Sequence, residues 1–165
     1  MRTAWALVAV ALLVAPALAQ QDRSRARAEN WGGIEGEPIR LDSPDPRHRE
    51  YLQTVSQQIK ANWGYPCVKN TMTLECEYRD ASLLVRFGIL ASGHLQATEI
   101  VRSSGIPIYD GYAVSAIRLG APYPPVPDAM LKTMKPGSTG IAIDVGFTYT
   151  ANQSTTTTIP AKSKP

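Results

Sequence analysis

The stretch IAIDVGFTY, residues 141–149, decides the fold expected for this chain. Large apolar side chains alternate along it with polar or small ones. The apolar set is Ile141, Ile143, Val145, Phe147 and Tyr149, and the intervening set is Ala142, Asp144, Gly146 and Thr148. Because successive side chains of a strand point to opposite faces, this period of two predicts a strand with one buried face and one wet face.

Two more strands are predicted upstream of this segment. Residues 82–90 (SLLVRFGIL) are rich in β-forming side chains, with alternation from Val85 to Ile89. Residues 91–93 (Ala-Ser-Gly) supply a turn, and residues 95–102 form a second β-rich run. Two such runs joined by a short turn that contains glycine predict a β-hairpin.

An amphipathic helix is predicted before the hairpin. Asp45 and Pro46 suit the N-cap and the first turn of a helix, and Gly64 suits its end. A helix of about 16 residues then places one apolar stripe on a single face. The stripe consists of Tyr51, Leu52, Val55, Ile59 and Trp63.

A second helix is predicted between the hairpin and the last strand. Residues 103–105 (Ser-Ser-Gly) form the turn that leads into it, and Asp110 is expected to cap its free N–H groups. Gly120 and Pro122 are expected to end it. Residues 121–127 (APYPPVP) should then be extended, because a residue that precedes proline avoids the helical region.

The predicted order is helix, strand, strand, helix, strand. The simplest packing of that order is an α+β fold, with two helices on a three-stranded antiparallel sheet. The domain should run over residues 45–150. Residues 20–44 are interpreted as a flexible lead-in without a core of its own, and residues 151–165 as a disordered Thr- and Pro-containing tail.

Residues 1–19 are predicted to be a cleavable signal peptide. Arg2 precedes an uncharged apolar stretch that ends in Ala17-Leu18-Ala19, a pattern that signal peptidase accepts. The alternative is an uncleaved inner-membrane anchor facing the periplasm, although a spanning helix needs about 20 apolar residues. The expected location of the mature domain is the periplasm.

Charge and cysteine content narrow the functional classes. The chain has 17 Lys and Arg against 14 Asp and Glu, which gives no electrostatic reason to expect a nucleic-acid partner. In an exported chain, the isolated pair Cys67 and Cys76 predicts a disulfide. A metal site is the alternative, but the spacing is not CxxC and only His48 and His94 could add imidazole ligands.

Several segments, taken in order, resemble the C-terminal domain shared by TonB-like and TolA-like envelope proteins. The resemblance covers residues 39–149. Its segments are the entry strand, the Asp-Pro helix start and the WGYP helix exit in residues 39–66, the hairpin with its Ser-Ser-Gly in residues 83–105, YDGYAVSAI, APYPPVP and IAIDVGFTY. The stretch CVKNTMTLECEYRDA departs from many relatives, which carry a short Ala- and Gly-containing segment there.

The resemblance implies a non-catalytic adaptor that binds envelope proteins, such as an outer-membrane receptor or a transport complex. In the TonB branch the last strand lies at a sheet edge and pairs with a receptor peptide. Here the corresponding strand would use Ile141, Ile143, Asp144, Val145, Gly146, Phe147, Thr148 and Tyr149, with Asp144, Gly146 and Thr148 flanking the peptide. The alternative is that this strand merely completes the sheet.

No catalytic pattern is found, and no cofactor or small-molecule substrate is expected. Ser103-Ser104-Gly105 does not match the G-x-S-x-G motif of a nucleophile elbow. His48 and His94 are interpreted as exposed surface residues. The carboxylates are scattered along the sequence, without the spacing expected of a catalytic pair. Two other functions stay open. One is a structural subunit of an envelope or secretion assembly that buries an aromatic surface around Tyr109, Tyr112 and Tyr123. The other is an energy transducer held by an uncleaved signal, although its apolar segment lacks the coupling His or Ser.

Overall fold

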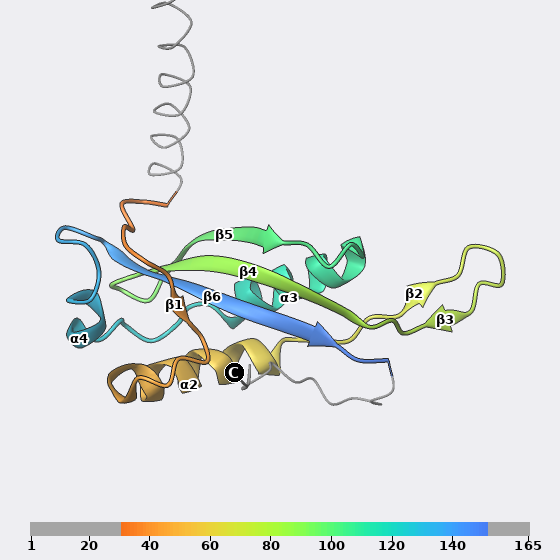
Figure 1. The fold of residues 1–165 in the computed structure, drawn as a ribbon, viewed down its shortest axis with the longest axis horizontal. Helices are drawn as coiled ribbons and strands as arrows, with labels where there is room; N and C mark the ends of the chain where they lie inside the picture. Colours follow the sequence, from red (N-terminus) through yellow and green to blue (C-terminus); the bar gives the residue numbers. More distant parts are fainter. Residues whose placement is uncertain (1–30, 152–165) are drawn as a thin grey trace, which may run out of the picture.

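Helices cover one face of a four-stranded mixed sheet (Figure 1). The computed structural model describes residues 31–151. The strands are β1 (Ile39–Arg40), β4 (Ala81–Leu90), β5 (Leu95–Arg102) and β6 (Gly140–Tyr149), and their order across the sheet is β1-β6-β4-β5. The α+β class is therefore confirmed.

The sheet differs from the prediction in its number of strands. The hairpin β4–β5 and the last strand β6 are present and pair antiparallel, as expected. A fourth strand, β1, pairs parallel to β6 through Ile39↔Ile143 and Arg40↔Asp144. The three-stranded antiparallel arrangement is thus wrong. A strand of two residues is too short to show an alternating pattern, so only the family resemblance, with its entry strand in residues 39–66, indicates it.

Helix α2 (Pro46–Ala61) forms where it was predicted. The Asp45 side chain accepts a hydrogen bond of 2.9 Å from the backbone N–H of Arg47, which satisfies one of the free donors at the helix start. The predicted stripe is buried against the sheet, and Trp63 joins it just after the helix. Asn62 rather than Gly64 caps the helix end.

Helix α3 (Pro107–Gly120) begins three residues before Asp110. Asp110 therefore does not cap it; Ile106 stands at the N-cap and offers no side-chain acceptor. Instead, the Asp110 carboxylate accepts hydrogen bonds from the Ser103 and Ser104 hydroxyls at 2.5 and 2.6 Å. The N-cap prediction for Asp110 was wrong because an acidic residue is favoured both at the N-cap and in the first turn of a helix, and the sequence alone does not separate these positions.

The proline-rich segment crosses the sheet in an extended form, as predicted, and leads to the short helix α4 (Asp128–Leu131). It is fastened to the β4–β5 turn by backbone bonds from Tyr123 to Gly93 (3.0 Å) and from Val126 to Ala91 (3.0 Å). Gly93 has φ +92°, and a Cβ there would collide with the Tyr123 carbonyl oxygen. The hairpin turn therefore requires glycine at this position.

A small second cluster lies on the sheet face opposite the helices. Across that face the small residues Ala97, Gly88 and Ala142 are register partners on three adjacent strands. Trp31 and Ile34 pack over this row and are 6% and 7% exposed. Trp31, Ile34 and Leu41 are therefore buried within residues 20–44, the stretch interpreted from the sequence as a flexible lead-in.

A disulfide-closed hairpin projects beyond the sheet (Figure 1). Its strands are β2 (Val68–Lys69) and β3 (Cys76–Glu77), which form a separate two-stranded sheet. Cys67 and Cys76 are bonded, with their Cα atoms 5.4 Å apart, so the predicted disulfide is present in the structure. We call residues 67–77 the arm. The predicted signal peptide and most of the predicted tail lie outside the described residues.

Candidate partner-binding edge

Strand β6 has β4 on one side and β1 on the other. In a strand, the backbone N–H and C=O of successive residues point alternately to the two sides. The Leu41 N–H donates to the Asp144 carbonyl over 2.9 Å, which assigns the backbone of Asp144 to the side away from β4. The backbone groups of Gly146 and Thr148 therefore point to that same outer side.

The outer side of β6 is divided into two parts. The first part is covered by the chain itself, through β1 at Ile143 and Asp144. Just before the strand, the Thr139 N–H also donates to Gly33 at 3.2 Å. Along residues 145–149, no strand among residues 31–151 pairs on this side. The backbone groups of Gly146 and Thr148 are left as a short open edge, which we call the open end of β6.

The predicted site residues separate by side-chain environment. Those in the odd-numbered positions are at most 2% exposed and belong to the core. They are Ile141, Ile143, Val145, Phe147 and Tyr149. Asp144, Gly146 and Thr148 lie on the other face and are partly exposed. A Cβ added to Gly146 would meet no atom within 4 Å, so there is free space beside the open end.

Asp144 is held by an ion pair that the sequence analysis did not identify. Arg86, its register partner on β4, donates to the two Asp144 oxygens over 2.7 and 2.9 Å. This bidentate hydrogen bond raises the pKa of the Arg86 guanidinium. Alternation along β4 indicates that Arg86 lies on the open face, but only the strand register shows that its partner is Asp144.

An aromatic cluster supports the last residue of β6. The Trp63 indole N–H donates to the Tyr149 hydroxyl at 2.9 Å, and that hydroxyl donates to the Tyr109 carbonyl at 3.0 Å. The Tyr109 and Tyr149 rings stack with centroids 4.4 Å apart. Burial raises the pKa of Tyr149 to about 12, although the Trp63 hydrogen bond opposes this shift. The open end is thus attached to a buried, hydrogen-bonded part of the core.

His48, His94 and Asp110, the other polar residues considered for a catalytic site, occupy different environments in the fold. His48 is 6% exposed, which contradicts its predicted surface position, and neither ring nitrogen has a hydrogen-bond partner among the described residues. His94 is exposed in the β4–β5 turn, 2.9 Å from the Ser92 hydroxyl. Burial disfavours the charged form of Asp110, but hydrogen bonds from Ser103 and Ser104 hold its pKa below the usual value.

Residues 31–151 contain neither a cluster of metal ligands nor a membrane-spanning helix. That part of the chain has no group of three or more His, Cys, Asp or Glu side chains placed to hold a metal ion. Within the same residues, no helix has the length and apolar character needed to cross a membrane.

A protein-family model described as TonB C terminal matches residues 48–136, more than half of the chain. The chain belongs to the TonB C-terminal family. No curated protein and no solved structure matches it. TonB C-terminal domains are non-catalytic and interact with envelope proteins such as outer-membrane receptors. The matched residues of this TonB C-terminal domain end before β6, so the family match does not include that strand.

Proposed function

We propose that this TonB C-terminal domain is a periplasmic, non-catalytic adaptor that docks on another envelope protein by strand pairing at the open end of β6. The observation that carries the proposal is the outward backbone of Gly146 and Thr148, which has no strand partner among the described residues. An unpaired edge accepts an extended peptide through main-chain hydrogen bonds. An outer-membrane receptor or transport protein is the proposed partner class.

The length of the open end limits what can bind there. Two residues with outward backbone groups offer two N–H donors and two C=O acceptors. Only a short extended segment can pair with these groups without displacing β1 from Ile143 and Asp144. Main-chain pairing supplies affinity with little sequence demand, so specificity must come from side chains at the edge.

Side chains beside the open end can supply part of that specificity. The position of Gly146 leaves space on the open face for a side chain of the bound segment. Asp144 and Arg86 form an ion pair next to this space, with side chains 16% and 24% exposed. A partner side chain placed over Gly146 would therefore have the Asp144–Arg86 ion pair, which is polar and carries no net charge, on one side.

Export supports the same proposal. The signal-like residues 1–19 and the disulfide between Cys67 and Cys76 fit an oxidising compartment. The proposed location of the mature domain is the periplasm, with an inner-membrane anchor as the alternative. Determining the N-terminus of the exported protein by mass spectrometry distinguishes them, because a start at Gln20 identifies a free domain.

Replacing the outward N–H at Thr148 tests the edge directly. Thr148→Pro removes a donor that β4 does not use, whereas Thr148→Ala retains it. In a titration of the isotope-labelled domain with a purified envelope partner, we expect amide shifts along residues 145–149 for the parent and for Thr148→Ala. Thr148→Pro should bind at least tenfold more weakly while remaining folded. Unchanged amide shifts along these residues in the bound complex would rule out strand pairing.

A structural subunit remains the second candidate function, and one observation favours it. Ile108, Tyr112 and Leu119 on α3 are 40%, 45% and 67% exposed. The aromatic surface expected for such a subunit is smaller than predicted, because Tyr109 and Tyr123 are buried in the domain's own core. A stable oligomer in a size measurement on the mature protein would favour this candidate, and a monomer would favour the adaptor.

A further inference from the structure

The tip of the arm carries two large apolar side chains in solvent. Met72 is 91% exposed and Leu74 is 75% exposed, the highest values among the large apolar residues of the described chain. Both lie in the loop between β2 and β3 (Figure 1). Apolar side chains that gather on a projecting loop commonly mark a contact with another molecule.

The tip is preorganised by hydrogen bonds. The Asn70 side-chain oxygen accepts from the backbone N–H groups of Met72 and Thr73 at 2.9 and 3.2 Å. The Asn70 carbonyl accepts from the Leu74 N–H at 3.0 Å, and its amide group donates to Glu77 at 2.7 Å. The disulfide closes the loop below this network. A loop held in one conformation loses less freedom when it binds.

Leu74 has a backbone conformation that is unfavourable for a leucine residue. It has φ +60°, the left-handed region in which glycine and asparagine are common and branched apolar residues are rare. Its side chain is exposed, so it does not contribute to a core. Folding of the arm alone would favour Asn or Gly here, and the leucine therefore calls for another explanation.

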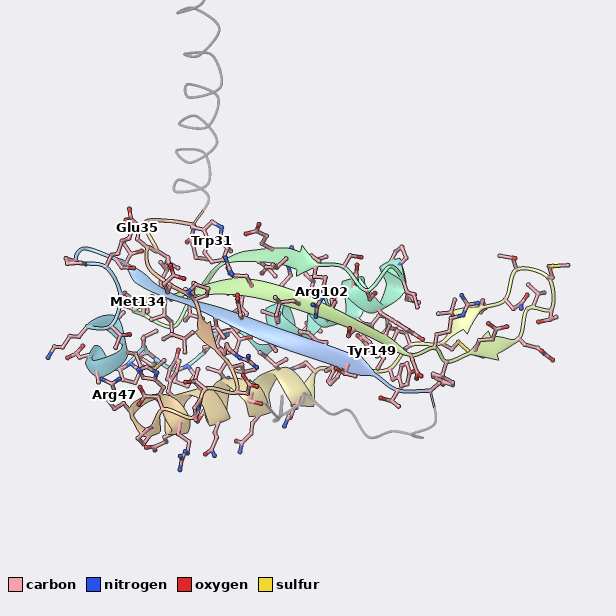
Figure 2. All side chains as sticks on the ribbon, viewed as in Figure 1. Trp31, Glu35, Arg47, Arg102, Met134 and Tyr149 are labelled. Atoms are coloured by element: carbon pink, nitrogen blue, oxygen red, sulfur yellow. A yellow bond between two sulfur atoms is a disulfide. The ribbon has the colours of Figure 1, made fainter. Side chains whose placement is uncertain are left out.

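The base of the arm lies near the end of β6. The Tyr65 ring contacts Tyr78 at the base of the arm, with centroids 4.9 Å apart, and Tyr149 at the end of β6, with centroids 5.2 Å apart. The Tyr65 hydroxyl also donates to the Arg79 carbonyl at 3.0 Å. Figure 2 shows Tyr149 at the end of β6 that is nearer to the arm. A protein that pairs with the open end therefore lies next to the base of the arm, and it must extend along the arm to reach the tip.

We infer that the arm is a second docking element, whose Met72 and Leu74 side chains insert into an apolar pocket on the same protein that pairs with β6. This inference rests on the proposed function. A protein pocket is favoured over an anionic membrane surface because the arm has one lysine and two glutamates, a net charge of −1. Membrane-binding segments are instead rich in lysine and arginine. The unbranched Met72 side chain adapts readily to such a pocket.

Site-specific photo-cross-linking in cells that export the full chain tests this inference. A benzophenone amino acid is placed at Thr73 on the tip or, in a separate chain, at Thr148 on the open end. Mass spectrometry identifies what each position captures. We expect both positions to capture the same envelope protein, because one partner spans both features.

Tip variants then show whether the apolar side chains matter. In the chain that carries the cross-linker at Thr148, Met72→Ser combined with Leu74→Asn should lower the yield at least tenfold. Thr71→Ala, a neighbouring exposed position, should leave the yield unchanged. Asparagine tolerates the backbone of Leu74, so the melting temperature of Leu74→Asn should equal or exceed that of the parent. Loss of capture would then not be a loss of folding.

Each other result overturns the inference in a distinguishable way. Capture at Thr148 that survives the tip variants leaves the proposed function intact and removes the arm from it. Capture at Thr73 alone overturns strand pairing and the two-point interface together. Capture of only lipid at Thr73, with Met72- and Leu74-dependent binding to phosphatidylethanolamine–phosphatidylglycerol vesicles, identifies the tip as a membrane contact. Capture of only a second copy of this chain identifies self-association.

Discussion

The β4–β6 pair and the β2–β3 pair show two ways of stabilising adjacent strands in one chain. In the sheet, β4 and β6 are paired from Ala81↔Tyr149 to Leu90↔Gly140, and Phe87 and Phe147 on this pair have no exposed surface. In the arm, two residue pairs and one disulfide join strands whose loop is exposed to solvent. Burial of apolar area stabilises the first pair, and a covalent bond restrains the second.

The difference shows how a hairpin that protrudes from the domain can stay folded without a hydrophobic core of its own. A two-stranded hairpin is marginal in water when nothing packs against it. The arm has a disulfide and the Asn70 network in place of a core, so its tip can remain apolar and exposed. We therefore expect changes in the sheet to act on the whole domain, and changes in the arm to act locally.

The largest expected effect is in the sheet. Phe147→Ala should lower the free energy of unfolding by about 3–5 kcal/mol, because it leaves a cavity in the core. Thr148→Ala, the adjacent partly exposed residue, should change it by less than about 1 kcal/mol. Urea unfolding followed by tryptophan fluorescence measures both. Equal effects of the two variants would contradict the predicted alternation of burial.

Removal of the disulfide should have the next largest effect, confined to the arm. For a loop of this length, the bond contributes roughly 2–3 kcal/mol by restricting the unfolded arm. In Cys67→Ser combined with Cys76→Ser, amide exchange at Val68, Asn70 and Glu77 should accelerate on the order of a hundredfold, while amides of β4 and β6 remain protected. Cooperative loss of protection in the sheet would show that the arm also stabilises the sheet.

High pH should destabilise the sheet through the aromatic cluster. Burial raises the pKa of Tyr149 to about 12, and burial together with Tyr109 raises that of Tyr65 to about 12. Because the folded pKa lies above the unfolded value, this stability is present below about pH 10 and is lost as the pH rises towards 12. Tyr149 alone accounts for about 2 kcal/mol of the loss.

Urea midpoints measured between pH 8 and pH 12 test this pH dependence. Tyr149→Phe cannot ionise and should show a shallower decline with pH. It should also be less stable at pH 8 by about 1 kcal/mol, since it loses the hydrogen bonds with Trp63 and Tyr109. An identical pH dependence in both proteins would exclude Tyr149 as the titrating group.

The smallest expected effect is at the tip of the arm. Asn70→Ala removes the acceptor used by Met72 and Thr73, a loss of about 1 kcal/mol in the local structure. Amide exchange at these two residues should accelerate roughly fivefold, with the melting temperature of the domain unchanged. Thr71→Ala is the matched control. A fall in the melting temperature would contradict the local character of the arm.

The elements with strong periodicity could be predicted from the sequence. Helix α2, the β4–β5 hairpin and β6 each repeat an apolar side chain at the period of their own geometry. The disulfide was predictable because a chain that is predicted to be exported has few other uses for an isolated cysteine pair. Strand β1 was indicated only by the entry strand of the family resemblance, because Ile39 and Arg40 are too few to form a pattern. Its parallel pairing with β6 had no signal in the sequence.

The sequence indicated β6 as the candidate edge strand, but it did not indicate how much of that edge is open. Alternation along β6 indicated which side chains are buried, but only the fold shows that β1 covers Ile143 and Asp144. The ion pair between Arg86 and Asp144 depends on the register of two strands that are distant in sequence. The open end of β6 is therefore shorter than the nine-residue edge that the sequence suggested.

Gly88 has a consequence for how this domain could vary among its relatives. A Cβ at Gly88 would lie 2.7 Å from Ile34 and 3.1 Å from the Trp31 ring, so the glycine makes room for both side chains. Any inherited change to a larger residue at this position would displace residues 31–34 from the sheet. We expect the three positions to covary, with a mid-strand glycine retained where Trp31 and Ile34 are retained and lost where they are lost.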